Sequence, residues 1–370
     1  MVEGAIEAMS VQLEKLGNPS SLHTQGREVR KELEQAREQL AKVIGCHASE
    51  IIFTGSGTEA NNTALKGLFW KNRPLGRNVV VISAIEHHAI LDPAHWLHDH
   101  DGAEVIVIGV DKHGVIDLGA LKALIDNRGD EIAVISVMHS NNETGVIQPI
   151  AQIVAIANVA SIPVHSDSVQ SFCKVPLSFS ELGLTAMTLS AHKIGGPLGI
   201  GILVLKRGID IPAILHGGGQ ERDIRSGTLN APSIVGFAVA SGLPIPVKDI
   251  AQLREEFTAG VLKAIPDAFV NGGSASDQLP GIVNITFPGT ESDTLLLLLD
   301  SKGISASTGS ACTAGVQRPS HVLLAMGHND KSARSSLRFS LGATTTHLEI
   351  AKVIDLLPAV INQARAANLR

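Results

Sequence analysis

Hydrophobic residues recur at helical spacing in one part of the chain and in short unbroken runs in the next. From Thr24 the apolar positions repeat every three or four residues, which predicts an amphipathic helix that ends at Gly45. Beyond it, β-branched runs predict strands at residues 51–53, 79–82, 105–108, 132–137, 162–164, 184–189 and 200–205. Buried strands that alternate with helices are typical of a mainly parallel sheet, so an α/β fold is expected.

The order of elements changes after the Leu-Pro-Ile-Pro segment at residues 243–246. A long helix, a strand at 282–287, a leucine-rich helix and a strand at 337–341 follow, and Thr346 and Glu349 stand at capping-box spacing before a last helix. We therefore predict a large α/β domain over residues 13–243 and a smaller α+β domain over residues 244–370. Residues 1–12 are expected to pack on the smaller domain.

Composition narrows the classes of function. The 370 residues include 30 Lys and Arg against 36 Asp and Glu, with 9 Phe, 2 Trp and no Tyr, which argues against direct nucleic-acid binding. The apolar runs are too short to cross a bilayer, and the first residues lack the pattern of a secretory signal, so we expect a cytoplasmic protein without a membrane partner. The three widely spaced cysteines, Cys46, Cys173 and Cys312, favour reduced thiols over a disulfide framework.

A glycine-rich turn follows the first predicted strand. Residues 53–61, Phe-Thr-Gly-Ser-Gly-Thr-Glu-Ala-Asn, lead from a strand into a helix, and N–H groups at such a helix start attract phosphate. The segment is not a nucleotide P-loop, because no Gly-Lys-Ser/Thr follows. A capped helix with a tight entry turn is the alternative interpretation.

Two charged residues stand at the ends of predicted buried strands. Asp167 follows one strand, where ligands of open α/β sheets collect, although it could instead cap a helix. Lys193 follows another strand and precedes glycines, where a desolvated amine can form an imine, although a solvated loop lysine is the commoner case. A phosphate cradle, an acid and an imine-forming lysine are together what pyridoxal 5'-phosphate requires.

Histidines gather after the strand at 79–82. Residues 86–88 read Glu-His-His, and His95, His98 and His100 follow. Because neither His-Glu-x-x-His nor a Cys/His set at finger spacing is present, we expect no metal site. Most of these histidines are expected to face solvent or to cap helices.

From Gly17 onward the chain resembles the cysteine desulfurases, class V members of the aminotransferase superfamily. The motifs that carry the resemblance lie at residues 58–62, 86–88, 138–145, 165–170, 190–193, 216–222, 225–228, 307–312 and 335–340. The resemblance implies a pyridoxal-phosphate-dependent transferase of fold type I, similar to aspartate aminotransferase. The fold class expected is thus a large α/β domain with a smaller α+β C-terminal domain.

The resemblance also assigns residues to the cofactor ring. Lys193 would hold the cofactor as a Schiff base, and Asp167 would pair with the ring nitrogen. Gln170 would bind the phenolic oxygen, while His87 would stack on the ring and assist proton transfer.

Further residues are assigned to the phosphate group. By the same resemblance it would be surrounded by Gly57, Thr58, Ser190 and His192. Thr228 would reach the phosphate of the neighbouring subunit, which implies a homodimer.

The substrate residues implied by the resemblance are Asn142, which also touches the cofactor, and Arg338, whose fork matches a carboxylate. Cys312 lies among small residues and would take sulfur from L-cysteine as a persulfide, leaving L-alanine. The sulfur would pass to an acceptor such as an iron-sulfur scaffold protein, for cluster assembly and other thiolation pathways. Cys46 and Cys173 are expected to be inert thiols.

The sequence departs from the family in one feature. Family members usually begin with a strand reading Tyr-Leu-Asp-x-x-Ala-Thr-Thr, which does not precede the first helix of this sequence. A catalytically impaired partner subunit is therefore one alternative function. A selenocysteine lyase or an aminotransferase of the same fold is another.

Overall fold

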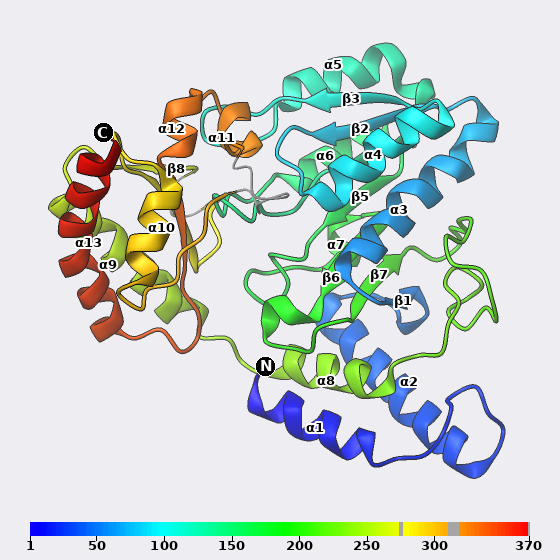
Figure 1. Ribbon diagram of the computed structural model, residues 1–370. Coiled ribbons are helices and arrows are strands. Elements are labelled where there is room, and N and C mark those ends of the chain that lie inside the picture. The colour runs from blue at the N-terminus through cyan, green and yellow to red at the C-terminus, as the bar shows by residue number, and fades with distance from the viewer. Residues whose placement is uncertain (274–276, 310–317, 369–370) are drawn as a thin grey trace. The chain divides into compact units, whose positions relative to one another are not determined.

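The computed structural model describes residues 1–273, 277–309 and 318–368, and the chain divides into two compact units (Figure 1). Unit 1 comprises Met1–Ile108, Leu118–His139 and Pro149–Pro244, and unit 2 comprises Gly109–Asp117, Ser140–Gln148 and Ile245–Arg370.

Within the described residues, unit 1 is built on a seven-stranded sheet with the strand order β1-β7-β6-β5-β4-β2-β3. The strands are β1 (Ile51–Thr54), β2 (Val79–Ser83), β3 (Glu104–Ile108), β4 (Ile132–Ser136), β5 (Val164–Asp167), β6 (Ala186–Ser190) and β7 (Gly201–Leu205). Strands β2 to β6 pair in parallel, whereas β7 runs antiparallel to both β1 and β6. The expected α/β fold with a mainly parallel sheet is confirmed.

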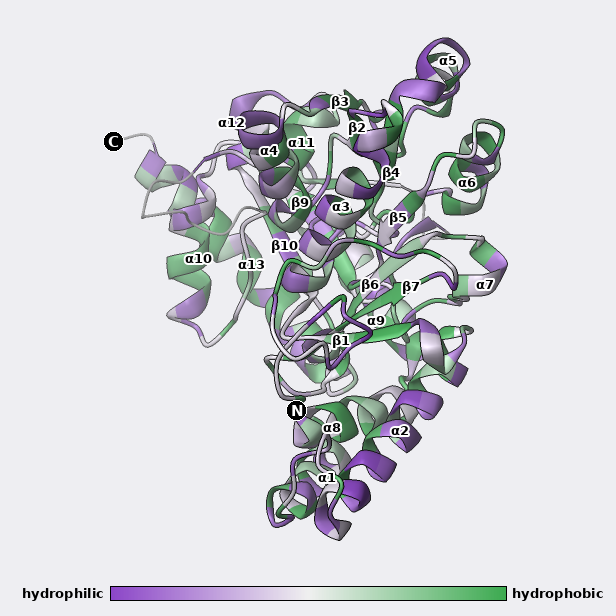
Figure 2. Ribbon diagram, turned by 90° about the vertical axis from the view of Figure 1, so that its right-hand side faces the viewer, coloured by the Kyte–Doolittle hydropathy of each residue, from purple (hydrophilic) through white to green (hydrophobic). Residues whose placement is uncertain are grey.

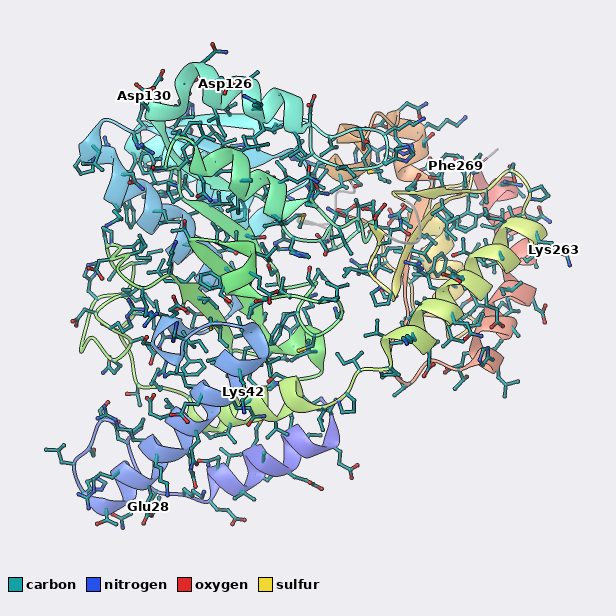
Figure 3. The ribbon with its side chains drawn as sticks, turned by 180° about the vertical axis from the view of Figure 1, so that it is seen from behind. Glu28, Lys42, Asp126, Asp130, Lys263 and Phe269 are labelled. Carbon is teal, nitrogen blue, oxygen red and sulfur yellow. The ribbon has the colours of Figure 1, made fainter. Side chains whose placement is uncertain are left out.

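The helices of unit 1 cover this sheet and form a layer beside it. They are α1 (Glu3–Leu13), α2 (Thr24–Ile44), α3 (Gly57–Asn72), α4 (His88–Asp101), α5 (Leu118–Arg128), α6 (Ile150–Asn158), α7 (Phe179–Leu182) and α8 (Ala231–Gly242). Helix α2 ends as predicted at Gly45, whose positive φ of 71° gives a left-handed cap. The outer face of α2 is hydrophilic (Figure 2), and Glu28 and Lys42 project from it (Figure 3). Strand β7, by contrast, is hydrophobic (Figure 2).

The first helix corrects the expectation that residues 1–12 pack on the smaller domain. Helix α1 packs against α8, inside unit 1. Ala5 is fully buried there, and the Val2 N–H donates to the Gly195 carbonyl at 2.8 Å. The helix therefore covers α8, a partner that the spacing of residues 1–12 could not identify.

Unit 2 is a smaller α+β body. Its sheet has the order β10-β9-β8, all antiparallel, with β8 (Phe269–Asn271), β9 (Ile282–Thr286) and β10 (Ser336–Ser340). Its helices are α9 (Val247–Ala264), α10 (Ser292–Asp300), α11 (His321–Ala325), α12 (Asp330–Arg334) and α13 (His347–Asn368). The predicted capping box is present, because the Thr346 N–H donates to Glu349 Oε2 at 2.8 Å and the Glu349 N–H donates to Thr346 Oγ1 at 3.3 Å.

Two loops assigned to the large domain from the sequence belong to unit 2, namely Gly109–Asp117 and Ser140–Gln148. The Leu279 N–H donates to the Gly145 carbonyl at 2.8 Å, and the Ile147 N–H donates to Asp277 at 2.9 Å. These bonds join the second loop to the C-terminal part of the chain. Unit 1 ends at Pro244, one residue after the predicted end of the large domain at residue 243. The large domain is not continuous over residues 13–243, because these two loops belong to unit 2.

In the part of the chain that the structure describes, no single helix is long and apolar enough to span a bilayer. Helices α8 and α9 meet those criteria only when taken together as a bent pair.

Candidate active site

The glycine-rich turn between β1 and α3 lies against the end of β6. Ser56 caps α3, because its side chain accepts the Glu59 N–H at 3.1 Å. The first N–H groups of a helix have no partner within the helix. A Cβ added at Gly57 would stand 3.1 Å from Val169 Cγ2 and 3.3 Å from Ser190 Cβ. The start of α3, the segment that follows β5 and the end of β6 therefore meet at one point.

Asp167 is the last residue of β5 and is only 7% exposed. Its Oδ2 accepts the Asn61 side-chain amide at 2.6 Å, and its Oδ1 accepts the Val169 N–H at 3.0 Å. Burial raises the pKa of the carboxyl, while these two bonds and the charges of His87 and Lys193 oppose that rise. Both hydrogen-bond donors are neutral amides, so the carboxylate is prepared for a positively charged ligand group.

Lys193 lies in a short 3-10 turn (Ala191–Ile194) directly after β6, and its side chain is exposed. The turn closes at Gly195, where φ is 78°. Ser190 Oγ lies 2.9 Å from His192 Nδ1, and burial together with the Lys193 charge lowers the pKa of His192. A neutral imidazole and a hydroxyl therefore lie where the end of β6 meets the turn at Gly55 and Ser56 that leads into α3, which is called the phosphate turn below.

The remaining predicted residues of unit 1 lie on four different segments. His87 is the N-cap of α4, with Nδ1 accepting the Ala89 N–H at 3.0 Å and its ring exposed. Gln170 follows β5, and its Oε1 accepts Lys174 Nζ at 3.4 Å. Thr58, in the first turn of α3, and Thr228, in the loop between β7 and α8, are exposed.

The other histidines near α4 largely bond to their own segment. His88 Nδ1 lies 3.0 Å from an Asp92 oxygen, and His98 and His100 bond to backbone carbonyls. Over the described ranges, no group of three or more His, Cys, Asp and Glu side chains is placed to hold a metal ion.

The two predicted substrate residues are neighbours within unit 2. Arg338, in β10, donates from Nη1 to the Asn142 carbonyl at 2.9 Å. Burial lowers the pKa of Arg338 and the charge of Glu143 raises it. The Arg338 Nε is buried and has no hydrogen-bond partner among the described residues, so it is a donor suited to a ligand carboxylate.

Cys312 lies outside the described residues, and its role stays a prediction. The other two cysteines are free thiols. Burial raises the pKa of Cys46 and of Cys173 to about 12 in each case. Both are therefore protonated at neutral pH, which agrees with the inert role expected for them.

Sequence reasoning assigned no role to two buried residues of this region. Asn61 holds Asp167, and its position one helical turn after Gly57 was the available signal. Glu86 is fully buried, and its Oε1 accepts Ser83 Oγ at 2.5 Å and the Met138 N–H at 2.8 Å. Burial raises the pKa of Glu86 to about 8. Only its place beside His87 in the chain pointed to Glu86.

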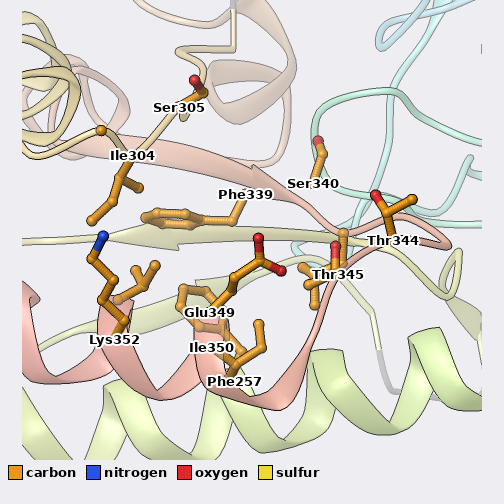
Figure 4. Close-up of a pocket in the computed structure, with 13 residues that line it drawn as sticks. Phe257, Ile304, Ser305, Phe339, Ser340, Thr344, Thr345, Glu349, Ile350 and Lys352 are labelled. Atoms are coloured by element: carbon orange, nitrogen blue, oxygen red, sulfur yellow. The ribbon is translucent and has the colours of Figure 1, made fainter.

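A cavity of about 290 Å³ lies in unit 2, between β10 and the start of α13 (Figure 4). Phe257, Phe339 and Ile350 give it an apolar wall, and Glu349 and Lys352 come from α13. Neighbouring residues of a strand project to opposite faces, so Phe339 lines this cavity while Arg338 points to the other face of β10. The cavity is therefore separate from the arginine site.

The residues present fit pyridoxal phosphate. The start of α3, with Gly57 against Ser190, offers N–H groups and hydroxyls to a phosphate. Asp167 is a buried carboxylate that lacks a hydrogen-bonded cation among the described residues, as the protonated ring nitrogen would require. The Asn61 side-chain oxygen is buried and has no hydrogen-bond partner in the described part of the chain, which also points to a polar occupant.

Comparisons with known proteins agree with this geometry. The sequence profile of the family described as Aminotransferase class-V matches residues 2–353. The chain is 44% identical to an IscS-like cysteine desulfurase of Mycobacterium tuberculosis, covering 100% of this chain and 95% of that protein. It is 41% identical to the cysteine desulfurase IscS of Dictyoglomus turgidum, covering 96% of this chain and 90% of that protein. A solved structure titled NifS-like protein matches with a TM-score of 0.89 and 33% identity, covering 98% of this chain and 96% of the other.

The chain belongs to the class-V aminotransferase family, the pyridoxal-phosphate-dependent enzymes of fold type I. Its similarity to the cysteine desulfurases, inferred above from short motifs, is confirmed over the full length.

Proposed function

We propose that this chain is a homodimeric cysteine desulfurase. It converts L-cysteine to L-alanine, holds the sulfur as a persulfide on Cys312, and passes it to an acceptor such as an iron-sulfur scaffold protein. The observation that carries the proposal is the contact between Asn61 and Asp167. This contact ties the acid for the ring nitrogen to the helix that begins at the phosphate turn, and Lys193 follows the adjacent strand.

Each residue of the site has a defined task. When bound, pyridoxal phosphate supplies an electron sink for carbanion chemistry at the substrate Cα. Asp167 keeps a proton on the ring nitrogen, and Lys193 anchors the cofactor and then takes the Cα proton. His87 assists proton transfer, and Arg338 binds the substrate carboxylate through its half-buried guanidinium.

Sulfur transfer requires a thiolate. The Cys312 thiolate attacks the substrate sulfur, so that an S–S bond forms as the Cβ–S bond breaks and its electron pair remains with the three-carbon product. Protonation of that product yields L-alanine. Cys46 and Cys173 are poor alternatives, because burial raises the pKa of both thiols to about 12.

The proposal includes a cytoplasmic location, since persulfide chemistry depends on reduced thiols. The exposed position of Thr228 agrees with a homodimer in which this residue meets the partner's cofactor phosphate. Cell fractionation tests the location, and sedimentation of the purified chain tests the dimer.

The decisive experiment compares Cys312→Ser with Cys173→Ser. Cys312→Ser should keep the cofactor and bind L-cysteine but release almost no alanine and carry no persulfide by mass spectrometry. Cys173→Ser should retain both products. Alanine formed from L-cysteine at the wild-type rate by Cys312→Ser would contradict the proposal, and activity toward selenocysteine alone would favour a selenocysteine lyase.

A further inference from the structure

The loop at residues 216–228, which carries Thr228, is fixed first to the strand that leads into the phosphate turn. Glu221 is 2% exposed, and its carboxylate accepts Arg37 Nη1 and Nη2 at 2.9 and 2.7 Å. The same carboxylate accepts the Phe53 N–H in β1 at 2.8 Å. The Arg37 guanidinium also lies 4.5 Å from the centre of the Phe53 ring. This first anchor therefore ends on β1.

A second anchor joins the loop to the helix that follows the turn. Arg225 Nε donates to Glu59 Oε1 at 2.9 Å, and Glu59 Oε2 accepts the Gly55 N–H at 2.7 Å. Gly55 belongs to the turn itself, and Glu59 lies in the first turn of α3. Arg225 Nη1 also reaches the Gly227 carbonyl at 3.5 Å, immediately before Thr228. One ion pair thus links the phosphate turn to the residue before Thr228.

The loop between these anchors has a defined shape. Arg222 and Asp223 both adopt left-handed backbone angles, with φ of 56° and 57°, which persist in non-glycine residues only where surrounding contacts impose them. Gln220 Oε1 accepts the Gly227 N–H at 2.8 Å across the loop. A loop that is closed on itself in this way moves with its anchors.

We propose that the Glu59–Arg225 ion pair couples the two cofactor sites of the dimer. In each subunit it joins the phosphate turn of that subunit's own site to the loop that presents Thr228 to the partner's site. The inference rests on the proposed function, in which Thr228 serves the neighbouring subunit. Arg225 and Glu59 are positioning residues, since their described contacts are with the turn and the loop.

The Glu59–Arg225 ion pair is placed so that it can change the affinity of the partner's cofactor site by a measurable factor. The Arg225 and Glu59 side chains are 18% and 23% exposed, so solvent screens them less than a fully exposed pair. A cofactor bound in one subunit fixes the turn at Gly55, and through Glu59 and Arg225 it fixes the loop offered to the partner. We expect the second cofactor to bind about fivefold more tightly than the first, the lower end of common coupling effects.

The test uses two mixed dimers that contain the same substitutions in different arrangements. In the first, one subunit carries Lys193→Ala and the other carries Arg225→Gln. In the second, one subunit carries both substitutions and the other is wild type. In each dimer only one subunit keeps Lys193, and titration of the cofactor-free dimer with pyridoxal phosphate reports that site through the absorbance of the Lys193-linked cofactor.

The two dimers should differ in cofactor affinity. In the second dimer the intact site receives its loop from the Arg225→Gln subunit, so it should bind about fivefold more weakly than the site of the first dimer. Equal affinities would show that Arg225 has only a general structural role, and the reverse order would show that the loop serves its own subunit. Either result overturns the coupling. A monomer in sedimentation would overturn the homodimer proposal itself.

Homodimers provide a second measurement. Wild-type dimers should bind cofactor cooperatively, whereas Glu59→Gln and Arg225→Gln dimers should not. Arg128→Gln is the matched control, because it breaks an ion pair of unit 1 with Glu104, 2.6 Å long, which touches neither the turn nor the loop. Loss of cooperativity in Arg128→Gln, or its retention in Arg225→Gln, would refute the proposal.

Discussion

Glu86 should make the cofactor-free protein less stable as the pH rises. The carboxyl is fully buried, and burial raises its pKa from 4.5 to about 8, against the opposing bonds from Ser83 and Met138. Below about pH 4.5 both the folded and the unfolded chain carry the proton. Between about pH 4.5 and 8 the unfolded chain loses the proton while the folded chain keeps it, so the free energy of unfolding falls as the pH rises.

The size of this effect follows from the width of that pH window. Each pH unit in which only the folded state holds the proton costs about 1.4 kcal/mol, so the whole window costs on the order of 5 kcal/mol. Glu86→Gln keeps an oxygen that can accept from Ser83 and Met138 and cannot ionise. The variant should therefore lose less stability than the wild type between about pH 4.5 and 8.

Urea unfolding of the cofactor-free protein at a series of pH values and one protein concentration measures this difference. Ser83→Ala is the control with the opposite sign, because loss of its hydrogen bond should raise the pKa of Glu86 further and extend the decline to higher pH. Parallel pH profiles for wild type and Glu86→Gln would refute the reasoning, as would a shallower profile for Ser83→Ala.

Three further substitutions test two residues of the site and the packing of Gly309 against Glu143. Asn61→Ala should weaken cofactor affinity by about 1.5–3 kcal/mol in equilibrium titration, because it removes a buried hydrogen bond to a charged group. Asn62→Ala is the control, because it loses only an exposed hydrogen bond within α3 and should change the affinity little. Gly309→Ala should lower the melting temperature, because a Cβ at this position would stand 2.0 Å from Glu143 Oε2. Overpacking of this kind lowers the free energy of unfolding by about 1–3 kcal/mol. An unchanged melting curve would contradict this prediction. Arg338→Lys should raise KM for L-cysteine more than it lowers kcat, because lysine lacks the bidentate fork of arginine. An unchanged KM in steady-state kinetics would count against binding of the substrate carboxylate by Arg338.

The sequence predicted the sheet of unit 1 well because most of its strands are buried. Each of β2, β4, β6 and β7 has five residues, all of them buried, so these strands give the largely apolar runs that mark buried strands in a sequence. Strand β8 was missed because it has only three residues and Phe269 is 38% exposed. A strand this short and partly exposed leaves no periodic pattern.

The site was predictable where chemistry depends on strand ends. Asp167 ends β5 and Lys193 follows β6, and the carboxyl ends of neighbouring parallel strands share one edge of a sheet. The contacts that support them were not predictable. Asn61 reaches Asp167 across 106 positions of sequence, and Glu86 reaches Met138 across 52, and no local pattern encodes such pairings.

The surroundings of Glu86 and Asp167 determine which of these two carboxyls carries the negative charge of the site. Both carboxyls are buried, and the charge of Asp167 raises the pKa of Glu86, so ionising both is costlier than ionising one. The charges of His87 and Lys193 favour ionisation of Asp167, and a protonated cofactor ring would favour it further. Glu86 is therefore the group that keeps its proton near neutral pH, which leaves Asp167 as the charged partner of the ring. A neutral residue at position 86 preserves that arrangement, so Glu86→Gln should retain the cofactor and turnover at pH 7. Loss of the cofactor in this variant, with the fold intact by circular dichroism, would mean that Glu86 itself carries the charge.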